Sequence, residues 1–154
     1  MPTDSQKRVL KKNRSLQIRL SPRLDAPEFL DLYRRYVVER HGHERPADED
    51  IAEFLGQMRT ESFVMAYYLD DALVGAGWID QVPGGLSSVY FAFDPGVASR
   101  SLGVFSTLKE IELARYLNLP WVYMGYWVEG APTMDYKKKY SPHEVLRDGR
   151  WTRP

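Results

Sequence analysis

The sequence contains no cysteine among its 154 residues. Without thiols the chain can form no disulfide, no cysteine nucleophile and no thiolate-held metal site. It also lacks an apolar run long enough to span a bilayer, and its first residues lack the apolar core of a secretory signal. Neither sign of charge is in excess, since 21 basic residues balance 21 acidic ones. We therefore expect a cytoplasmic protein without a membrane partner, and the balance argues mildly against a general nucleic-acid binder.

The sequence contains enough apolar residues to form one hydrophobic core. Hydrophobic residues make up 44% and charged residues 27%, which is ordinary for a globular domain. No internal repeat, low-complexity tract or linker interrupts the sequence. We therefore predict a single domain over residues 1–154.

The charges are distributed unevenly, with basic residues near both ends and acidic residues between them. The basic residues are Lys7, Arg8, Lys11, Lys12 and Arg14 at one end, and Lys137, Lys138, Lys139, Arg147, Arg150 and Arg153 at the other. The two ends would form one patch if the fold brought them together. Charge alone favours two solvated and partly frayed ends.

Hydrophobic periodicity predicts the order of the helices and strands. We expect strands over 16–20, 63–69, 73–79, 87–93, 121–127 and 144–146. Helices are expected over 25–42 with Asp25 as the N-cap, from Asp48 with Phe54 and Met58 on its core face, over 101–117, and over 133–140. The core order is β-α-α-β-β-β-α-β, an α+β layout with an antiparallel meander and a crossover helix between parallel strands. It resembles the GNAT-type acyltransferase fold, in which these two strands splay apart and hold the acyl donor in the resulting notch.

The turn before the long helix is the first candidate site. Arg100, Ser101 and Gly103 stand where the helix begins, and the N–H groups of a helix N-terminus and a guanidinium both suit an anion. In GNAT acetyltransferases the matching loop reads Gln/Arg-x-x-Gly-x-Gly/Ala and holds pyrophosphate, whereas here the last position is Phe105. Taken alone, the short pattern favours a plain helix start.

A longer combination of motifs resembles one family over nearly the whole chain. Its parts are Arg8-Val9-Leu10-x-x-Asn13, Tyr33-x-x-Tyr36, Phe93-Asp94-Pro95, Arg100-Ser101-Leu102-Gly103, Ile111-Glu112-Leu113-Ala114, Leu119-Pro120, Tyr123-Met124-Gly125-Tyr126-Trp127, Met134-x-Tyr136-Lys137, Tyr140-x-Pro142-x-Glu144-Val145-Leu146 and Gly149-Arg150-Trp151. In this order they resemble the C-terminal domain of aminoacyl-tRNA–protein transferases, the arginyltransferases and bacterial leucyltransferases of the N-degron pathway. The resemblance implies transfer of Leu or Arg from tRNA to the N-terminal amine of a protein, commonly one that begins with Asp or Glu.

The implied chemistry is aminolysis of an activated ester, which requires no enzyme nucleophile and no cofactor. Modest base assistance suffices for an α-amine, and backbone N–H groups at a strand bulge can bind the oxyanion. We predict Asp94 and Tyr90 as catalytic residues, with Asp94 binding the incoming ammonium or relaying its proton. The alternative for Asp94 is that it only caps the Asp-Pro turn.

Aromatic and basic residues in the second half of the sequence are candidates for binding the donor. The stacking faces offered to the terminal adenosine of tRNA are those of Tyr90, Tyr123, Tyr126 and Trp127, although core packing is the ordinary role of such residues. Alternation along a strand would put Tyr126 on the opposite face from Tyr123 and Trp127. The set of candidate phosphate contacts is Tyr136, Lys137 and Lys139, for which a solvated charge run is the alternative.

Members of this family normally carry a further N-terminal domain with cysteines that bind metal or an iron–sulfur cluster. The sequence contains no such cysteine, so it corresponds to an excised fragment or a short relative, with a partner domain supplied in trans as one arrangement. His41 and His43 lack a third ligand at a clear spacing, so no metal is predicted. Two other functions stay open. One is an acyl-CoA-dependent N-acetyltransferase, and the other is a non-catalytic module of the same fold.

Overall fold

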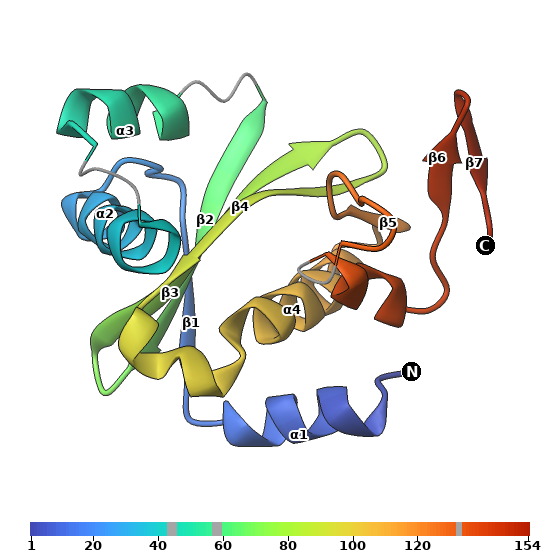
Figure 1. Ribbon diagram of the computed structural model, residues 1–154, viewed down its shortest axis with the longest axis horizontal. Helices are drawn as coiled ribbons and strands as arrows, with labels where there is room; N and C mark the ends of the chain where they lie inside the picture. The colour runs from blue at the N-terminus through green and yellow to red at the C-terminus, as the bar shows by residue number, and fades with distance from the viewer. Residues whose placement is uncertain (43–45, 57–59, 132–133) are drawn as a thin grey trace.

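The computed structural model describes residues 1–42, 46–56, 60–131 and 134–154 (Figure 1). At its centre is a five-stranded sheet of order β1-β2-β3-β4-β5. The strands are β1 (Gln17–Ser21), β2 (Glu61–Leu69), β3 (Ala72–Val82), β4 (Gly85–Phe93) and β5 (Trp121–Tyr123). All neighbours are antiparallel except β4 and β5, which are parallel. The predicted α+β class, the meander and the parallel crossover pair are confirmed.

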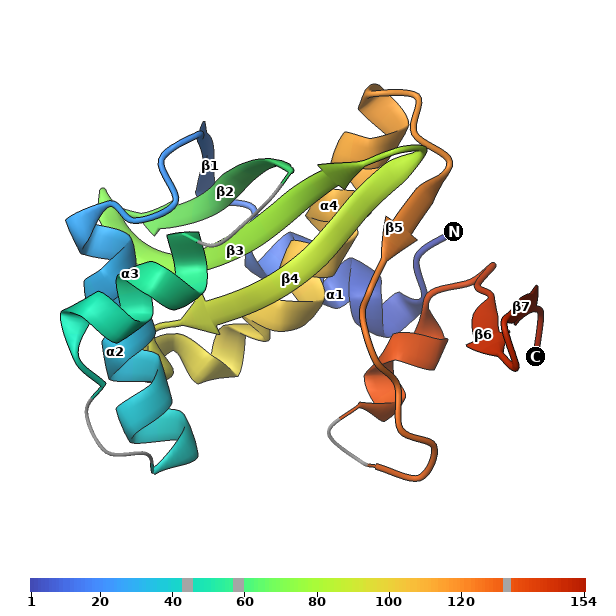
Figure 2. The same ribbon diagram turned by 90° about the horizontal axis from the view of Figure 1, so that it is seen from above.

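Helices cover both faces of this sheet (Figures 1 and 2). One face is covered by α2 (Pro27–His41) and α3 (Asp48–Gly56), and the other by α1 (Asp4–Lys12) and α4 (Leu102–Tyr116). In β2, Val64, Ala66 and Tyr68 pack on the α2 side, while Met65 and Tyr67 pack on the α4 side. Because both faces are buried, this strand is apolar throughout instead of alternating. Among the described helices, none has the length and apolar character needed to cross a bilayer.

Two β-hairpins have two-residue turns in which both residues adopt the left-handed backbone conformation. Asp70 and Asp71 join β2 to β3 with φ values of 49° and 63°. Asp148 and Gly149 join β6 (Val145–Arg147) to β7 (Arg150–Thr152), with φ values of 48° and 74°. Positive φ at both central residues matches the twist of paired strands. The predicted Asp70-Asp71 turn is confirmed, and the predicted last strand is one arm of a hairpin whose second arm, β7, was not predicted.

Two boundary predictions and one prediction of a core residue were wrong. Strand β5 ends at Tyr123 instead of continuing to Trp127, and Gly125 beyond it has a φ of 70°. Ala26, not Asp25, is the N-cap of α2, and Asp25 pairs with Arg23 at 3.4 Å instead. Phe54 does not lie in the core of α3, because 53% of it is exposed. The expected short helix corresponds to the 3₁₀ helix η2 (Asp135–Lys139). The predictions for His43, Met58 and Thr133 lie outside the described residues.

Helix α1 precedes the predicted element order and was not predicted. Thr3 and Gln6 form a capping box, with the Gln6 N–H donating to the Thr3 hydroxyl at 3.3 Å and the Thr3 N–H donating to Gln6 Oε1 at 2.8 Å. Gln6, Val9, Leu10 and Asn13 form its inward stripe at helical spacing. The expectation of a frayed N-terminal end is therefore wrong, and both the box and the stripe were present in the sequence.

Candidate functional site

The parallel strands β4 and β5 separate soon after they begin. They pair only over Gly85–Ser87 and Trp121–Tyr123. Strand β4 then continues to Phe93, and from Ser88 onward its outer edge has no strand partner within the described part of the chain. Figure 2 shows the chain after β5 running away from β4 at this point. We call the region between β4 beyond Ser87 and the segment after Tyr123 the notch. The predicted separation of the two strands is confirmed.

A β-bulge in β4 lies at the beginning of the notch. The register pairs Trp78 with Tyr90 but Ile79 with Ser88, so Val89 is an extra residue. If Val89 were an ordinary paired residue of the strand, Ser88 and Tyr90 would point to the same face of the sheet. With the bulge, Ser88 faces α4 as Ile79 does, and Tyr90 faces α2 as Trp78 does. A bulge at this position is the backbone feature that we expected to bind an oxyanion.

Helix α4 places a carboxyl group against the α4-facing side of the bulge. Glu110 is only 1% exposed. Its Oε1 accepts a hydrogen bond from Ser106 Oγ at 2.8 Å, and the Tyr67 hydroxyl donates to Ser106 Oγ at 3.0 Å. Oε2 has no hydrogen-bond partner within the described ranges, although the Ser88 hydroxyl lies close enough to favour the charged form. Glu110 therefore has one free oxygen near the point where β4 and β5 separate.

Burial sets the proton affinity of this group. Desolvation raises the pKa of Glu110, and the hydroxyls of Ser106 and Ser88 offset the rise only in part. A carboxyl group with a raised pKa and a free oxygen can accept a proton or bind an ammonium group. We did not identify Glu110 from the sequence. The available signal was an acid at helical spacing within the buried stripe Leu102, Ser106, Glu110 and Ala114.

Residues from distant parts of the chain enclose Glu110. A Cβ atom at Gly77 on β3 would lie 3.3 Å from Ser106 Oγ and 3.7 Å from Glu110 Oε1, so this strand approaches the network closely. Tyr136 and Tyr140 come from the C-terminal segment, with ring centroids 6.5 Å apart. Burial raises the pKa of Tyr136 and raises that of Tyr140 to about 12, and the nearby Glu110 adds to both shifts. Both phenols are therefore neutral near pH 7.

Lys137 determines the course of the chain after β5. Its Nζ donates to the carbonyl oxygens of Met124, at 2.7 Å, and Tyr126. Burial lowers the pKa of the Lys137 ammonium. This side chain was predicted to contact phosphate, and in the structure it holds the segment that borders the notch. Lys139 is exposed, and its carbonyl accepts a hydrogen bond from Gln6 Nε2 at 3.3 Å.

The candidate aromatic residues do not form one cluster. Tyr123 packs against Trp151 of β7, with centroids 5.9 Å apart. Tyr126 is 90% exposed, and Trp127 is half-buried with no hydrogen-bond partner for Nε1 in the described chain. Because β5 ends at Tyr123, the expected alternation does not extend to Tyr126 and Trp127. Their contact with a donor stays a prediction.

Tyr90 lies on the opposite face of the sheet from Glu110. Its ring centroid is 5.1 Å from that of Tyr33 and 6.4 Å from that of Tyr36. Burial, followed by the two neighbouring phenols, raises the pKa of Tyr90. Its hydroxyl is thus a neutral hydrogen-bond donor near pH 7, and its catalytic role stays a prediction.

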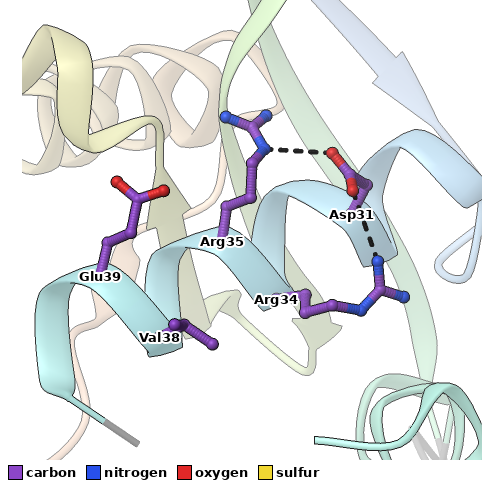
Figure 3. Close-up of a pocket in the computed structure, with 5 residues that line it drawn as sticks. All are labelled: Asp31, Arg34, Arg35, Val38 and Glu39. Atoms are coloured by element: carbon purple, nitrogen blue, oxygen red, sulfur yellow. Dashed lines mark hydrogen bonds and ion pairs between the residues drawn. The ribbon is translucent and has the colours of Figure 1, made fainter. Parts of the chain in front are cut away.

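Both carboxylate oxygens of Asp94 have partners. Oδ1 accepts the Gly96 N–H at 2.8 Å, which caps the 3₁₀ helix η1 (Pro95–Arg100), and Oδ2 accepts from Arg35 Nη1 at 2.9 Å. Arg35 belongs to a hollow along α2, where Asp31 lies between Arg35, at 3.1 Å, and Arg34, at 3.4 Å (Figure 3). The capping role named for Asp94 is thus present, and its role in the reaction stays a prediction.

Three substitutions can separate the cap from the ion pairs. Asp94→Ala removes both the cap and the pair with Arg35, and we expect it to lower the free energy of unfolding by about 1–2 kcal/mol, as loss of an N-cap does. Arg35→Met keeps the cap and removes the ion pairs of Arg35 with Asp94 and with Asp31, which are partly exposed, and should lower the free energy of unfolding by less than about 1 kcal/mol. Asp94→Ser keeps a capping hydroxyl and should recover most of the first loss. Urea unfolding measures all three, and equal losses for Asp94→Ala and Arg35→Met would rule out a contribution from the cap.

The turn before α4 is held by α1. Arg100 Nη1 donates to the Lys12 carbonyl at 3.3 Å, and Asn13 Nδ2 donates to the Arg100 carbonyl at 2.8 Å. Ser101 is in the left-handed region with a φ of 55°. Among the described residues, a Cβ atom at Gly103 would meet only Phe91, at 3.9 Å, so packing against them does not require glycine there. That leaves close approach of a ligand as a reason for this residue.

Phe105 occupies the core instead of lining this turn. It is 3% exposed, and its ring packs 5.8 Å from that of Tyr67. The position that is small in the acetyltransferase loop is therefore filled by a core residue. The described residues contain no group of three or more potential metal ligands. With no cysteine in the sequence, a thiolate-held metal or cluster has no ligands in this chain.

Solved structures with this architecture support the fold. A possible acetyltransferase from Clostridium difficile 630 aligns with a TM-score of 0.62 and 10% identity, covering 80% of this chain and 87% of that one. An aminoglycoside acetyltransferase from an uncultured soil metagenomic sample aligns with a TM-score of 0.54 and 16% identity, covering 84% and 89%. At these identities the similarity establishes the GNAT-type fold alone.

Sequence relatives identify the family. The family model described as "Arginine-tRNA-protein transferase, C terminus" matches residues 28–147. The aspartate/glutamate leucyltransferase of Thiobacillus denitrificans is 42% identical over 98% of this chain, and that of Marinobacter nauticus is 39% identical over 97%. The chain spans 64% and 65% of the length of these two relatives. It therefore belongs to the arginine-tRNA–protein transferase family, in the part that corresponds to the family's C terminus.

Proposed function

We propose that this chain transfers an amino acid from tRNA to the N-terminal amine of a protein, with leucine as the amino acid and Asp or Glu as the acceptor residue. The names of the relatives support this choice of substrates. The observation on which it depends is Glu110, a buried carboxyl group with a free oxygen near the point where β4 and β5 separate. Charged tRNA is a cytoplasmic substrate, so we infer the same location for the protein.

The reaction is an ester aminolysis. The nitrogen of the acceptor amine attacks the ester carbonyl carbon, a C–N bond forms, and the C–O bond to the terminal ribose breaks. The amine loses a proton, and the ribose oxygen takes one up. The bulge at Val89 would supply N–H donors to the oxyanion, and Glu110 would accept the proton of the amine. The turn at Arg100–Gly103 would hold a phosphate of the donor.

A transfer assay tests this proposal. The purified chain is incubated with radiolabelled leucyl-tRNA or arginyl-tRNA and with peptides that begin with Asp, Glu or Met. We expect label from leucyl-tRNA on the Asp and Glu peptides and none on the Met peptide. The Thiobacillus denitrificans relative serves as the positive control, and a further arm adds the remaining third of that relative in trans.

Absence of transfer in every arm, under conditions in which the relative is active, would contradict the proposal. Acetyl-CoA is the competing donor, since acyl-CoA-dependent acetylation is the alternative for this fold. Calorimetry with acetyl-CoA separates the two, because tight binding would favour the acetyltransferase. Phe105 in place of a small residue leads us to expect no such binding.

A further inference from the structure

Helix α1 connects the two sides of the notch. Near its beginning, Gln6 Nε2 donates to the Lys139 carbonyl of η2 at 3.3 Å. At its end, Lys12 Nζ donates to the Ser99 carbonyl of η1 at 2.6 Å, and Asn13 contacts Arg100. Figure 1 shows α1 running beneath α4, with the N-terminus on the side of η2. The basic residues of α1 are therefore adjacent to the lysines of η2, a question that their charges alone left open.

The basic side chains of α1 face outward. Its apolar stripe, with Val9 and Leu10, packs toward α4. Arg8 and Lys11 are exposed on the other side, and neither forms an ion pair within the described ranges. Arg14 and Lys139 are also exposed and lack ion pairs with described residues. These cations are available to a partner.

Charge is concentrated on this part of a neutral chain. Residues 4–14, 95–103 and 134–140 contain nine basic and two acidic residues, whereas the whole chain has 21 of each. The rest of the chain therefore has an acidic excess. We call the surface formed by Arg8, Lys11, Lys12, Arg14, Arg100, Lys138 and Lys139 the basic band. Such a local concentration attracts polyanions even when the net charge is zero.

The basic band adjoins the notch at two places. At η2, Tyr136 lies close enough to Glu110 for the carboxyl to raise the pKa of the phenol, while Lys138 and Lys139 are exposed. At η1, Arg100 stands directly before α4, the helix that carries Glu110. A ligand that occupied the band would therefore reach the notch without crossing the sheet.

We propose that the basic band binds the sugar–phosphate backbone of an RNA, namely the acceptor stem of the donor tRNA. This inference rests on the proposed function. A membrane surface fits less well, because an interfacial helix inserts an apolar face, and that face of α1 is already packed inside the protein. A short acidic peptide fits less well too, because it would use few of these separated cations. Repeated phosphates along a backbone match cations spread over three segments.

The test measures RNA binding, which does not depend on transfer. Fluorescence anisotropy with an uncharged tRNA acceptor-stem hairpin is recorded over a range of salt concentrations. The variant Arg8→Gln/Lys11→Gln keeps good helix formers at both positions, and circular dichroism verifies that α1 is retained. A matched control, Arg23→Gln/Arg115→Gln, removes two exposed cations outside the band. We expect the slope of log K against log salt to become shallower by about 2 in the variant and to stay unchanged in the control.

Each outcome has a defined meaning. An unchanged slope in the band variant, or an equal change in the control, would overturn the inference. Vesicles containing phosphatidylserine should not bind, and binding that depends on Arg8 and Lys11 would overturn the choice of RNA. If the chain transfers leucine while the slope is unchanged, the inference fails and the proposed function stands. If the hairpin binds through the band but no transfer occurs, the proposed function fails and the surface assignment stands.

Discussion

A Glu110→Gln variant should be more stable than the parent protein at pH 8 and defective in transfer. Burial raises the pKa of Glu110 in the folded protein above its ordinary value of 4.5. The folded state therefore binds more protons than the unfolded state between these two pKa values, and the free energy of unfolding falls as the pH rises through that window. Glutamine resembles the neutral acid and does not titrate. The variant and the parent should be similar at pH 4 and should diverge above it.

Urea unfolding at several pH values measures this divergence. Each unit by which the folded pKa is raised corresponds to about 1.4 kcal/mol in favour of the variant at high pH. In the transfer assay, loss of a general base should lower the rate by about 10²-fold to 10⁴-fold. Glu112→Gln is the matched control, because Glu112 lies on the same helix but is exposed and pairs with Lys109 at 2.6 Å. A variant that keeps the parent's rate would exclude Glu110 as the proton acceptor, whatever its stability.

A Lys137→Met variant should lose stability and loosen the segment after β5. The substitution keeps the aliphatic stem but removes the ammonium that donates to the carbonyls of Met124 and Tyr126. Hydrogen bonds to a charged group contribute about 1.5–3 kcal/mol each, and desolvation of the ammonium offsets part of this. We therefore expect the free energy of unfolding to fall by about 2 kcal/mol. Amide exchange should become faster at residues 124–127.

The neighbouring lysine provides the control for that experiment. Lys138 is half-exposed and pairs with Asp135 at 3.1 Å on the surface. Lys138→Met should change the free energy of unfolding by less than about 1 kcal/mol and leave the amide exchange of residues 124–127 unchanged. Similar effects of the two substitutions would mean that charge in η2, and not the two hydrogen bonds of Lys137, determines stability.

Local patterns were sufficient for most of the sheet and for α4. The run 63–69 and the Asp70-Asp71 turn predicted β2 and its hairpin, because strand propensity and turn conformation depend on adjacent residues. Beyond the end of β5, Lys137 donates to the carbonyls of Met124 and Tyr126 from more than ten residues away in the sequence, a contact that no local pattern could show. Helix α1 was predictable from the Thr3–Gln6 capping box, but its many basic residues favoured a solvated end.

The site was harder to predict than the fold, because burial of a polar group is a property of its neighbours. Glu110 looks like an ordinary helix acid until Gly77, Ser88 and Ser106 are placed around it. The turn at Arg100 and Gly103 was found from its place before a predicted helix, and the family resemblance then supported it. Alternation along β4 does not predict which face of the sheet Tyr90 lies on, because the extra residue Val89 shifts the alternation by one position.

The bulge at Val89 changes how β4 must be aligned with other sequences. Before it, even-numbered residues such as Leu86 and Ser88 face α4, whereas after it the odd-numbered Phe91 does. If an alignment gap were placed at another position of β4, every residue between that position and Val89 would be assigned to the wrong face of the sheet. Deletion of Val89 alone would make Ser88 and Tyr90 consecutive residues, which alternation places on opposite faces, so the strand would lose its bulge while every side chain kept its present face.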